Sequence, residues 1–372
     1  MIQMAPRERW LNCMRGEPVD RVPLHLEGFH VESRQNLEDW ADLRKRELAE
    51  RLFDEIHFWF HVPSHVNRYL VTAPQRVRAT KKDQTTEGVV TTGEIDTPKG
   101  NLTFCTGRNP ESNTTWTIKY PVESLDDIEK IRSVPSELPE HLAPPDMDNL
   151  PCDFDRRGII RLGVSSPFVC VAGMMPYDYF LELCALELEL IRELTTICRD
   201  RILSILEVVL ADKTVEYVWM GGCEWVTPPM GSPELYDELV NKFEEPIIRR
   251  IHEAGAVSHV HCHGNVRTTL QSVIERGGDY FEPVEPPPDG DITFTEAKAT
   301  AAGLMTLGGN IEARVLENAG EEEFEHAARA PFEGTKERMV YHNTAGPIST
   351  LTDTSYRNYS RLIDIWEELS TV

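Results

Sequence analysis

Residues 256–265 read Ala-Val-Ser-His-Val-His-Cys-His-Gly-Asn, a short strand with a polar end. The first half alternates in polarity, which predicts a strand. Residues two apart on a strand share a face, so His259, His261 and His263 should line one side and Cys262 the other. Imidazoles at a strand end, just before a glycine turn, are suited to binding a metal or moving protons.

The same rhythm of strand, polar turn and helix extends outward from this stretch. After an opening helix at 6–14 and a turn into a first strand near residue 24, strands are predicted at 158–164, 215–220, 256–261, 279–281, 304–307 and 338–341. Helices are predicted between or after them at 177–210, 232–254, 268–276, 295–302, 321–330 and 354–369.

Strands that alternate with helices at this spacing indicate a parallel sheet. We therefore expect an α/β fold, a closed (β/α)8 TIM barrel, forming a single domain over residues 1–372. A doubly wound open sheet is the alternative, and it fits less well because no glycine-rich phosphate turn follows an early strand.

The first third of the chain contains a segment of different texture. Residues 78–119 are rich in Thr, Val and Gly, with a turn at 97–101 between alternating runs. This pattern predicts antiparallel hairpins inserted between barrel elements. A helix is expected on each side, at 37–53 and from a serine cap at Ser124, and residues 136–152 should form an irregular connection.

Composition limits the class of partner. The net charge of −24 argues against nucleic acids and anionic membranes, which carry phosphate charge. The eight cysteines are dispersed without a CxxC pair, as is typical of free thiols in a reducing cytosol. We find no signal-peptide pattern and no apolar run long enough to span a membrane, so a cytoplasmic protein with a small-molecule substrate is expected.

Polar residues recur just after the predicted strands. They are Glu224, His261 with His263, Glu282, Asn310 and His342. In (β/α)8 barrels the active site lies at the carboxyl ends of the strands. The recurrence of acids, imidazoles and amides at those ends therefore predicts an enzyme.

The sharpest hypothesis is a metal site formed by His261, His263 and a carboxylate such as Glu224, or by the two histidines with His342. Two histidines and a glutamate are a known zinc set, although other divalent metals would also suit it. The alternative is a hydrogen-bonded polar cluster in the barrel mouth. His259 lies deeper and is expected to be a core or orienting histidine, and Cys262 to pack.

Catalytic and substrate-binding roles are assigned more broadly. Glu224, which follows Gly221 and Gly222, is a candidate general acid or base, as are His342 and one of Glu282 and Glu285. Asn310 is a candidate for binding a substrate carbonyl. Further candidates for lining the pocket are Tyr177, Tyr179 and Trp225, for which simple packing is the alternative.

Several motifs in order resemble the uroporphyrinogen decarboxylase superfamily, which includes cobalamin-dependent methyltransferases. They span nearly the whole chain: Arg7-Glu8-Arg9 with 20–23, 232–236 through 252–255, His261-Cys262-His263-Gly264-Asn265, Gly308-Gly309-Asn310-Ile311, and 345–348 with Asn358. The resemblance implies a (β/α)8 barrel and a homodimer.

The sequence departs from both branches of this superfamily. Decarboxylases carry an arginine-rich segment where this chain reads Leu24-His25-Leu26-Glu27-Gly28-Phe29-His30, which has no arginine pair and adds a carboxylate. The methyltransferases bind zinc through His-x-Cys and a later cysteine, whereas here His263 takes the first cysteine position and no cysteine follows Cys262. A zinc site built on thiolates is therefore not expected.

Three functions stay open at this stage. The first is a methyltransferase that moves a methyl group from a small donor to a corrinoid on a separate protein, assisted by a divalent metal, with zinc the first candidate. The second is a metal-free decarboxylase or lyase of a small carboxylic acid, with His342 and Glu224 as proton donors. The third is a binding protein without catalysis.

Overall fold

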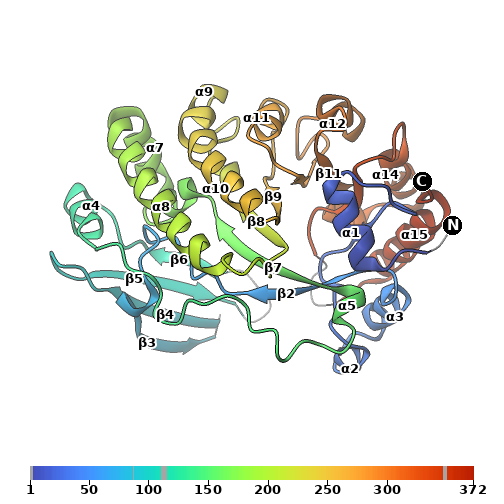
Figure 1. The fold of residues 1–372 in the computed structure, drawn as a ribbon, viewed down its shortest axis with the longest axis horizontal. Coiled ribbons are helices and arrows are strands. Elements are labelled where there is room, and N and C mark those ends of the chain that lie inside the picture. The colour runs from blue at the N-terminus through green and yellow to red at the C-terminus, as the bar shows by residue number, and fades with distance from the viewer. Residues whose placement is uncertain (1–2, 87, 110–114, 347–349) are drawn as a thin grey trace.

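The computed structural model describes residues 3–86, 88–109, 115–346 and 350–372. Its core is a curled sheet of eight parallel strands in the order β1-β12-β11-β10-β9-β8-β7-β2, with helices ranged along one side (Figure 1). These strands are β1 (Leu24–His25), β2 (Phe58–Val62), β7 (Gly158–Ser165), β8 (Tyr217–Gly221), β9 (Val257–His261), β10 (Tyr280–Glu282), β11 (Thr306–Ile311) and β12 (Met339–Asn343). The predicted α/β barrel-like fold is confirmed.

Strands β1 and β2 are the two edges of the curled sheet. Within the described residues, the strand pairings run from β1 round to β2 without a ladder that joins these two edges. Strand β2 was not predicted from the sequence. Its residues, Phe-Trp-Phe-His-Val, form a short aromatic run without clear alternation, so periodicity does not mark them.

The helices largely follow the prediction, with two interruptions. The helix predicted at 37–53 is wrong as one element: α2 (Arg34–Glu38) and α3 (Leu43–Leu52) are separate, because the Asp42 side chain accepts from the amides of Arg44 and Lys45 and starts a new helix. The helix predicted at 232–254 contains α9 (Pro233–Tyr236), a π-helical turn (Asp237–Asn241) and α10 (Lys242–Glu253).

The described residues form further α-helices. They are α1 (Pro6–Arg15), α4 (Leu125–Arg132), α5 (Phe154–Arg157), α6 (Pro167–Ala172), α7 (Tyr177–Leu186), α8 (Leu188–Val209), α11 (Thr269–Glu275), α12 (Phe294–Ala301), α13 (Ala313–Asn318), α14 (Glu321–Arg329) and α15 (Asp353–Leu369). Ser124 accepts from the amide of Asp127 at the start of α4, as its N-cap position predicts.

A second, antiparallel sheet contains β3 (Val77–Thr85), β4 (Gly88–Ile95), β5 (Leu102–Arg108) and β6 (Thr115–Lys119) in chain order. It confirms the inserted hairpins, except that residues 87 and 110–114 lie outside the described part. The insertion is anchored to the main core by buried Ile95, Leu102 and Phe104, and the Phe104 ring lies 5.0 Å from that of Tyr69.

Helix α1 covers the amino ends of the strands. Its Trp10 is buried in a cluster with Ile159, Tyr217, Val257 and Tyr280, which stand at or near the beginnings of β7, β8, β9 and β10. Since this end is filled by packed side chains, chemistry is directed to the carboxyl ends.

Two expectations from the sequence remain, one about membrane-spanning helices and one about the motif at 345–348. None of the helices in the described ranges combines the length and the apolarity needed to cross a bilayer. Of the motif at 345–348, Pro347 and Ile348 lie outside the described residues.

Candidate active site

Strand register places the polar residues of neighbouring strands level with one another. His261 at the end of β9 lies opposite Glu282 of β10 and Gly221 of β8. Two strands further along the sheet from β10, His342 of β12 lies opposite Asn310 of β11 and His25 of β1. The curl of the sheet therefore turns these side chains toward a common interior.

Glu282 is the centre of this interior. Its Oε1 lies 2.7 Å from His259 Nε2 and 2.7 Å from His261 Nδ1, so both imidazoles donate to one carboxylate oxygen. His342 Nδ1 lies 3.6 Å from Oε2 of the same carboxylate. The carboxylate is buried, with a side-chain exposure of 7%.

The tyrosine beneath this group orients His259. Tyr217, at the beginning of β8, has its hydroxyl 2.8 Å from His259 Nδ1. Because His259 Nε2 donates to Glu282, Nδ1 is the acceptor and the Tyr217 hydroxyl donates to it. His259 is thus a buried, hydrogen-bonded histidine, which is one of the two alternatives predicted for it.

The protonation states of the cluster follow from burial and charge. Burial by itself would raise the pKa of Glu282, but the imidazoles of His261 and His259 hold that pKa well below its usual range. Burial opposes a charge on His261, yet the adjacent Glu282 raises its pKa. Burial lowers the pKa of His259 to about 4 and that of His342 to about 3, so both are neutral at pH 7.

The predicted metal set of His261, His263 and Glu224 is not assembled. His263 lies beyond the end of β9, where strand alternation has ceased, and its Nδ1 lies 2.9 Å from Glu285 Oε1. Glu224 lies in a 3-10 turn after β8, and its Oε2 accepts from the amide of Gly222 at 3.1 Å. Among the described side chains, the group with metal-ligand spacing that contains His261 is His259, His261 and Glu282.

The other predicted residues fall into two places. Asn310 and His342 are buried within β11 and β12 rather than just past the strands, because both strands run longer than predicted. Tyr177 at the start of α7 and Trp225 in the turn after β8 contact each other: the Tyr177 hydroxyl donates to the Trp225 carbonyl, and their rings are 5.5 Å apart.

Cys262 is buried and its amide donates to the Glu282 carbonyl, so it helps hold β9 against β10. A hydrogen bond with the Cys223 thiol, together with burial, raises the pKa of the Cys262 thiol well above its usual range. A neutral, enclosed thiol fits the predicted packing role and not a nucleophile.

Several interior residues were missed by reasoning from sequence. A small cavity is lined by Trp10, His25, Glu27, Trp59, Arg161, His259, Tyr280, Glu282 and His342. The Arg161 guanidinium lies over the rings of Trp59 and Trp219, at 5.0 and 5.4 Å from their centroids. The inward parity of β7 would have indicated Arg161, whereas Trp59 lies on the strand that was not predicted.

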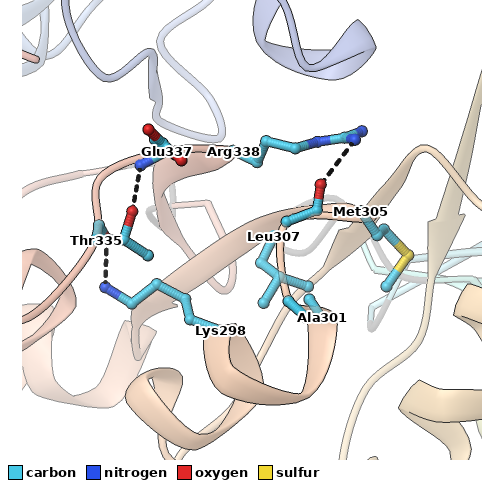
Figure 2. Close-up of a pocket in the computed structure, with 9 residues that line it drawn as sticks. Lys298, Ala301, Met305, Leu307, Thr335, Glu337 and Arg338 are labelled. Atoms are coloured by element: carbon cyan, nitrogen blue, oxygen red, sulfur yellow. Dashed lines mark hydrogen bonds between the residues drawn. The ribbon is translucent and has the colours of Figure 1, made fainter.

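A separate hollow lies near the amino ends of β11 and β12, lined by Lys298, Met305, Leu307 and Arg338 among others (Figure 2). Lys298 Nζ donates to the carbonyls of Pro331, Glu333 and Thr335, and Arg338 donates to the carbonyl of Gly303. Both cations are thus occupied in holding loops together, and the hollow is at the end of the sheet opposite Glu282.

Comparison with solved structures supports the fold. A methyltransferase from Methanosarcina mazei is similar over 98% of this chain and 99% of its own, with a TM-score of 0.59 and 13% identity. A B12-independent methionine synthase from Shewanella sp. W3-18-1 matches over 79% of this chain and 75% of its own, with 9% identity and a TM-score of 0.37. No protein-family model and no curated protein matches the sequence.

Proposed function

We propose that this chain is a methyltransferase of the uroporphyrinogen decarboxylase superfamily. It moves a methyl group from a small methylated donor to a corrinoid carried by a separate protein. The proposal draws on the ordered motifs in the sequence and on a fold shared, almost end to end, with a methyltransferase. The observation that carries it is the convergence of His259 Nε2 and His261 Nδ1 on one oxygen of Glu282 at the carboxyl ends of the strands.

The side chains present fit a divalent metal. Two imidazoles and a carboxylate, buried together with their ligand atoms within 4.8 Å of one another, form a donor set that zinc accepts. With a metal on Nε2, His259 would carry its proton on Nδ1 and donate it to the Tyr217 hydroxyl oxygen, as metal-binding histidines donate to an outer partner. When bound, such a metal would act as a Lewis acid toward the heteroatom of the methyl donor.

The surrounding residues suit methyl transfer. The methyl carbon bonds to the corrinoid cobalt(I), whose electron pair forms the new bond, while the electrons of the broken bond stay on the heteroatom of the donor. Arg161, held between Trp59 and Trp219, offers a permanent positive charge toward that developing charge. The neutral imidazole of His342 adds a polar wall without a competing positive charge.

Aromatic residues beyond the carboxyl end of β8 form a surface that we assign to the mouth of the site. Trp225 and Tyr177 pack edge to face beyond the end of β8, and the Arg68 guanidinium lies over the Trp225 ring at 5.3 Å. We assign these aromatic residues to the wall that meets the donor or the corrinoid. The polar lining of the cavity differs from the apolar filling that a binding protein without catalysis would be expected to have.

The experiment measures the spectral conversion of cob(I)alamin to methylcobalamin by the purified protein with methoxylated aromatics, methylamines, methanol and methylthiols. Conversion with one donor class, lost in Glu282→Gln and His261→Ala and kept in the exposed His141→Gln control, is the expected result. No conversion with any donor by metal-loaded protein, combined with carbon dioxide release from a small carboxylic acid, would instead establish the lyase.

A further inference from the structure

A second cluster of imidazoles lies between the two edge strands of the sheet. His25 ends β1, His30 lies in the loop that follows it, and His57 immediately precedes β2. One ring nitrogen from each residue lies within 4.8 Å of those of the other two. The ring centroids are 4.3 Å apart for His25 and His30, and 5.0 Å apart for His30 and His57.

Hydrogen bonds fix the tautomers of two of these rings. The Nδ1 of His30 lies 2.7 Å from the His57 carbonyl oxygen, and the Nε2 of His25 lies 2.9 Å from Glu27 Oε1. A carbonyl or a carboxylate only accepts, so each of these ring nitrogens carries the proton. The opposite nitrogens, His30 Nε2 and His25 Nδ1, therefore present lone pairs.

These two lone pairs, and the Nε2 of His57, have no protein partner. His25 Nδ1, His30 Nε2 and His57 Nε2 are all buried and make no hydrogen bond within the described part of the chain. Buried polar groups without partners are rare because they cost free energy. Three of them on adjacent rings point to a ligand that all three share.

The environment of the three rings suits a metal. Metals bind the neutral imidazole, and all three rings lie among buried side chains. The carbonyl and carboxylate that bind the far nitrogens of His30 and His25 are the outer partners usual for metal-binding histidines.

We propose that His25 Nδ1, His30 Nε2 and His57 Nε2 form a second metal site, which takes a divalent cation that prefers imidazole, such as Zn²⁺. This site is distinct from the group around Glu282 and does not depend on the function proposed above. His342 packs against His25, with ring centroids 4.6 Å apart, but its Nδ1 faces Glu282 and belongs to the first group.

We call the unpaired boundary between the edge strands β1 and β2 the seam, and the three-histidine group the seam site. The role that follows from the position of this site is to link the two edge strands. In the described residues no ladder joins these strands, and protein links across the seam include Arg157, which donates to the carbonyls of Val31 and Ile56, and the bond from His30 to His57. A cation held by the last residue of β1, by the residue before β2 and by one residue of the loop after β1 would tie both edges together.

The test separates the two sites with variants. Metal-free protein is titrated with Zn²⁺. Bound zinc and the midpoint of thermal unfolding are measured for the wild type, for Glu282→Gln, for Glu282→Gln combined with His30→Ala or with His30→Cys, and for the exposed control His141→Gln. We expect Glu282→Gln to keep one zinc per chain, with a higher midpoint when zinc is present. His30→Ala in that background should weaken this binding at least about tenfold and remove the thermal shift.

The His30→Cys variant distinguishes loss of a zinc ligand from loss of folding. A thiolate is itself a zinc ligand, so this variant should retain zinc, whereas a purely structural role for His30 would make Ala and Cys equivalent. Glu282→Gln protein that binds no zinc, or binds it equally with and without His30, overturns the proposal. A single zinc that depends on His30 and not on Glu282 would uphold the seam site and remove the metal from the proposed methyltransferase.

Discussion

Glu282 accepts hydrogen bonds from two imidazoles at the same carboxylate oxygen. His259 Nε2 and His261 Nδ1 both lie 2.7 Å from its Oε1. An amide in place of the carboxylate would present a neutral oxygen and a weaker ligand. We expect Glu282→Gln to reduce metal affinity at this group at least about tenfold. Isothermal titration with Zn²⁺ measures this, in protein whose seam site is disabled by His30→Ala.

The matched control for that change is Glu285→Gln. Glu285 accepts from His263 and from the amide of Gly264, one turn beyond the strand end, so it shapes the loop without touching the shared oxygen. Equal losses of affinity in Glu282→Gln and Glu285→Gln would contradict the assignment of Glu282 as a ligand.

Gly308 makes room for the same cluster. A Cβ built on it would lie 2.1 Å from the Tyr280 hydroxyl and 2.7 Å from the Cβ of Glu282. Gly308→Ala must therefore displace both side chains, and we expect it to lower the free energy of unfolding by about 1–3 kcal/mol and to reduce activity. Urea unfolding measures the first quantity.

Gly320 provides the comparison for Gly308. It has φ −69° and an added Cβ would meet nothing within 4 Å, so Gly320→Ala should cost only the poorer N-cap of α14, about 0.5–1 kcal/mol. If Gly308→Ala cost no more than Gly320→Ala, the close approach of Glu282 to β11 would be refuted.

At the scale of elements, α10 is tied to β9 and β10 through one ion pair. His252 Nε2 near the end of α10 lies 2.8 Å from Asp279 Oδ2, and the same oxygen accepts from the amide and hydroxyl of Ser258. The hydrogen bond with Asp279 raises the pKa of His252 against the effect of burial.

This pair predicts how stability depends on pH. Because the pKa of His252 is raised on folding, its contribution is fully present below its unfolded pKa of about 6.5 and is lost as pH rises through the higher folded value. The stability difference between wild type and His252→Gln should therefore be largest near pH 5–6 and shrink at higher pH. Urea midpoints across pH 5–9 measure it, and a difference that grows with pH would contradict the pairing.

Individual strands show which parts of the site could be predicted from the sequence. Strand β9 and its inward residues His259 and His261 were predictable because alternation is strict there. The partner of His261 was not, because the pairing of Glu282 depends on the register between β9 and β10, and parity fails once the strand ends before His263. His57 and Trp59 were missed since β2 carries an aromatic run without period.

For the whole molecule, the distribution of polar groups is asymmetric along the barrel axis. The amino ends of the strands are filled by α1 and apolar or aromatic residues, whereas the interior above them holds histidines and carboxylates. The two imidazole groups meet through His25 and His342, on paired strands, so β1 and β12 connect the seam to the centre around Glu282.

Trp10 packs beneath the seam histidines and beside Tyr280, so its substitution should affect both the stability of the protein and the position of these side chains. Its ring lies 4.2 Å from that of His57, 5.4 Å from His25 and 5.6 Å from Tyr280, and the side chain is almost fully buried. Trp10→Ala would open a cavity under the sheet, and we expect it to lower the free energy of unfolding by about 3–5 kcal/mol. Partly exposed Trp116 on the antiparallel sheet is the control, with an expected change of about 1 kcal/mol or less.

The same variant tests whether the barrel floor positions the imidazoles. If Trp10 holds His25 and His57 in place, Trp10→Ala should weaken Zn²⁺ binding at the seam, while Trp10→Phe, which keeps an aromatic ring there, should restore much of it. Zinc titration of both variants in the Glu282→Gln background measures this effect apart from global stability, at a temperature where each is folded. Unchanged affinity in folded Trp10→Ala protein would show that the seam histidines are held by their own hydrogen bonds to Glu27 and to the His57 carbonyl, and not by the helix beneath them.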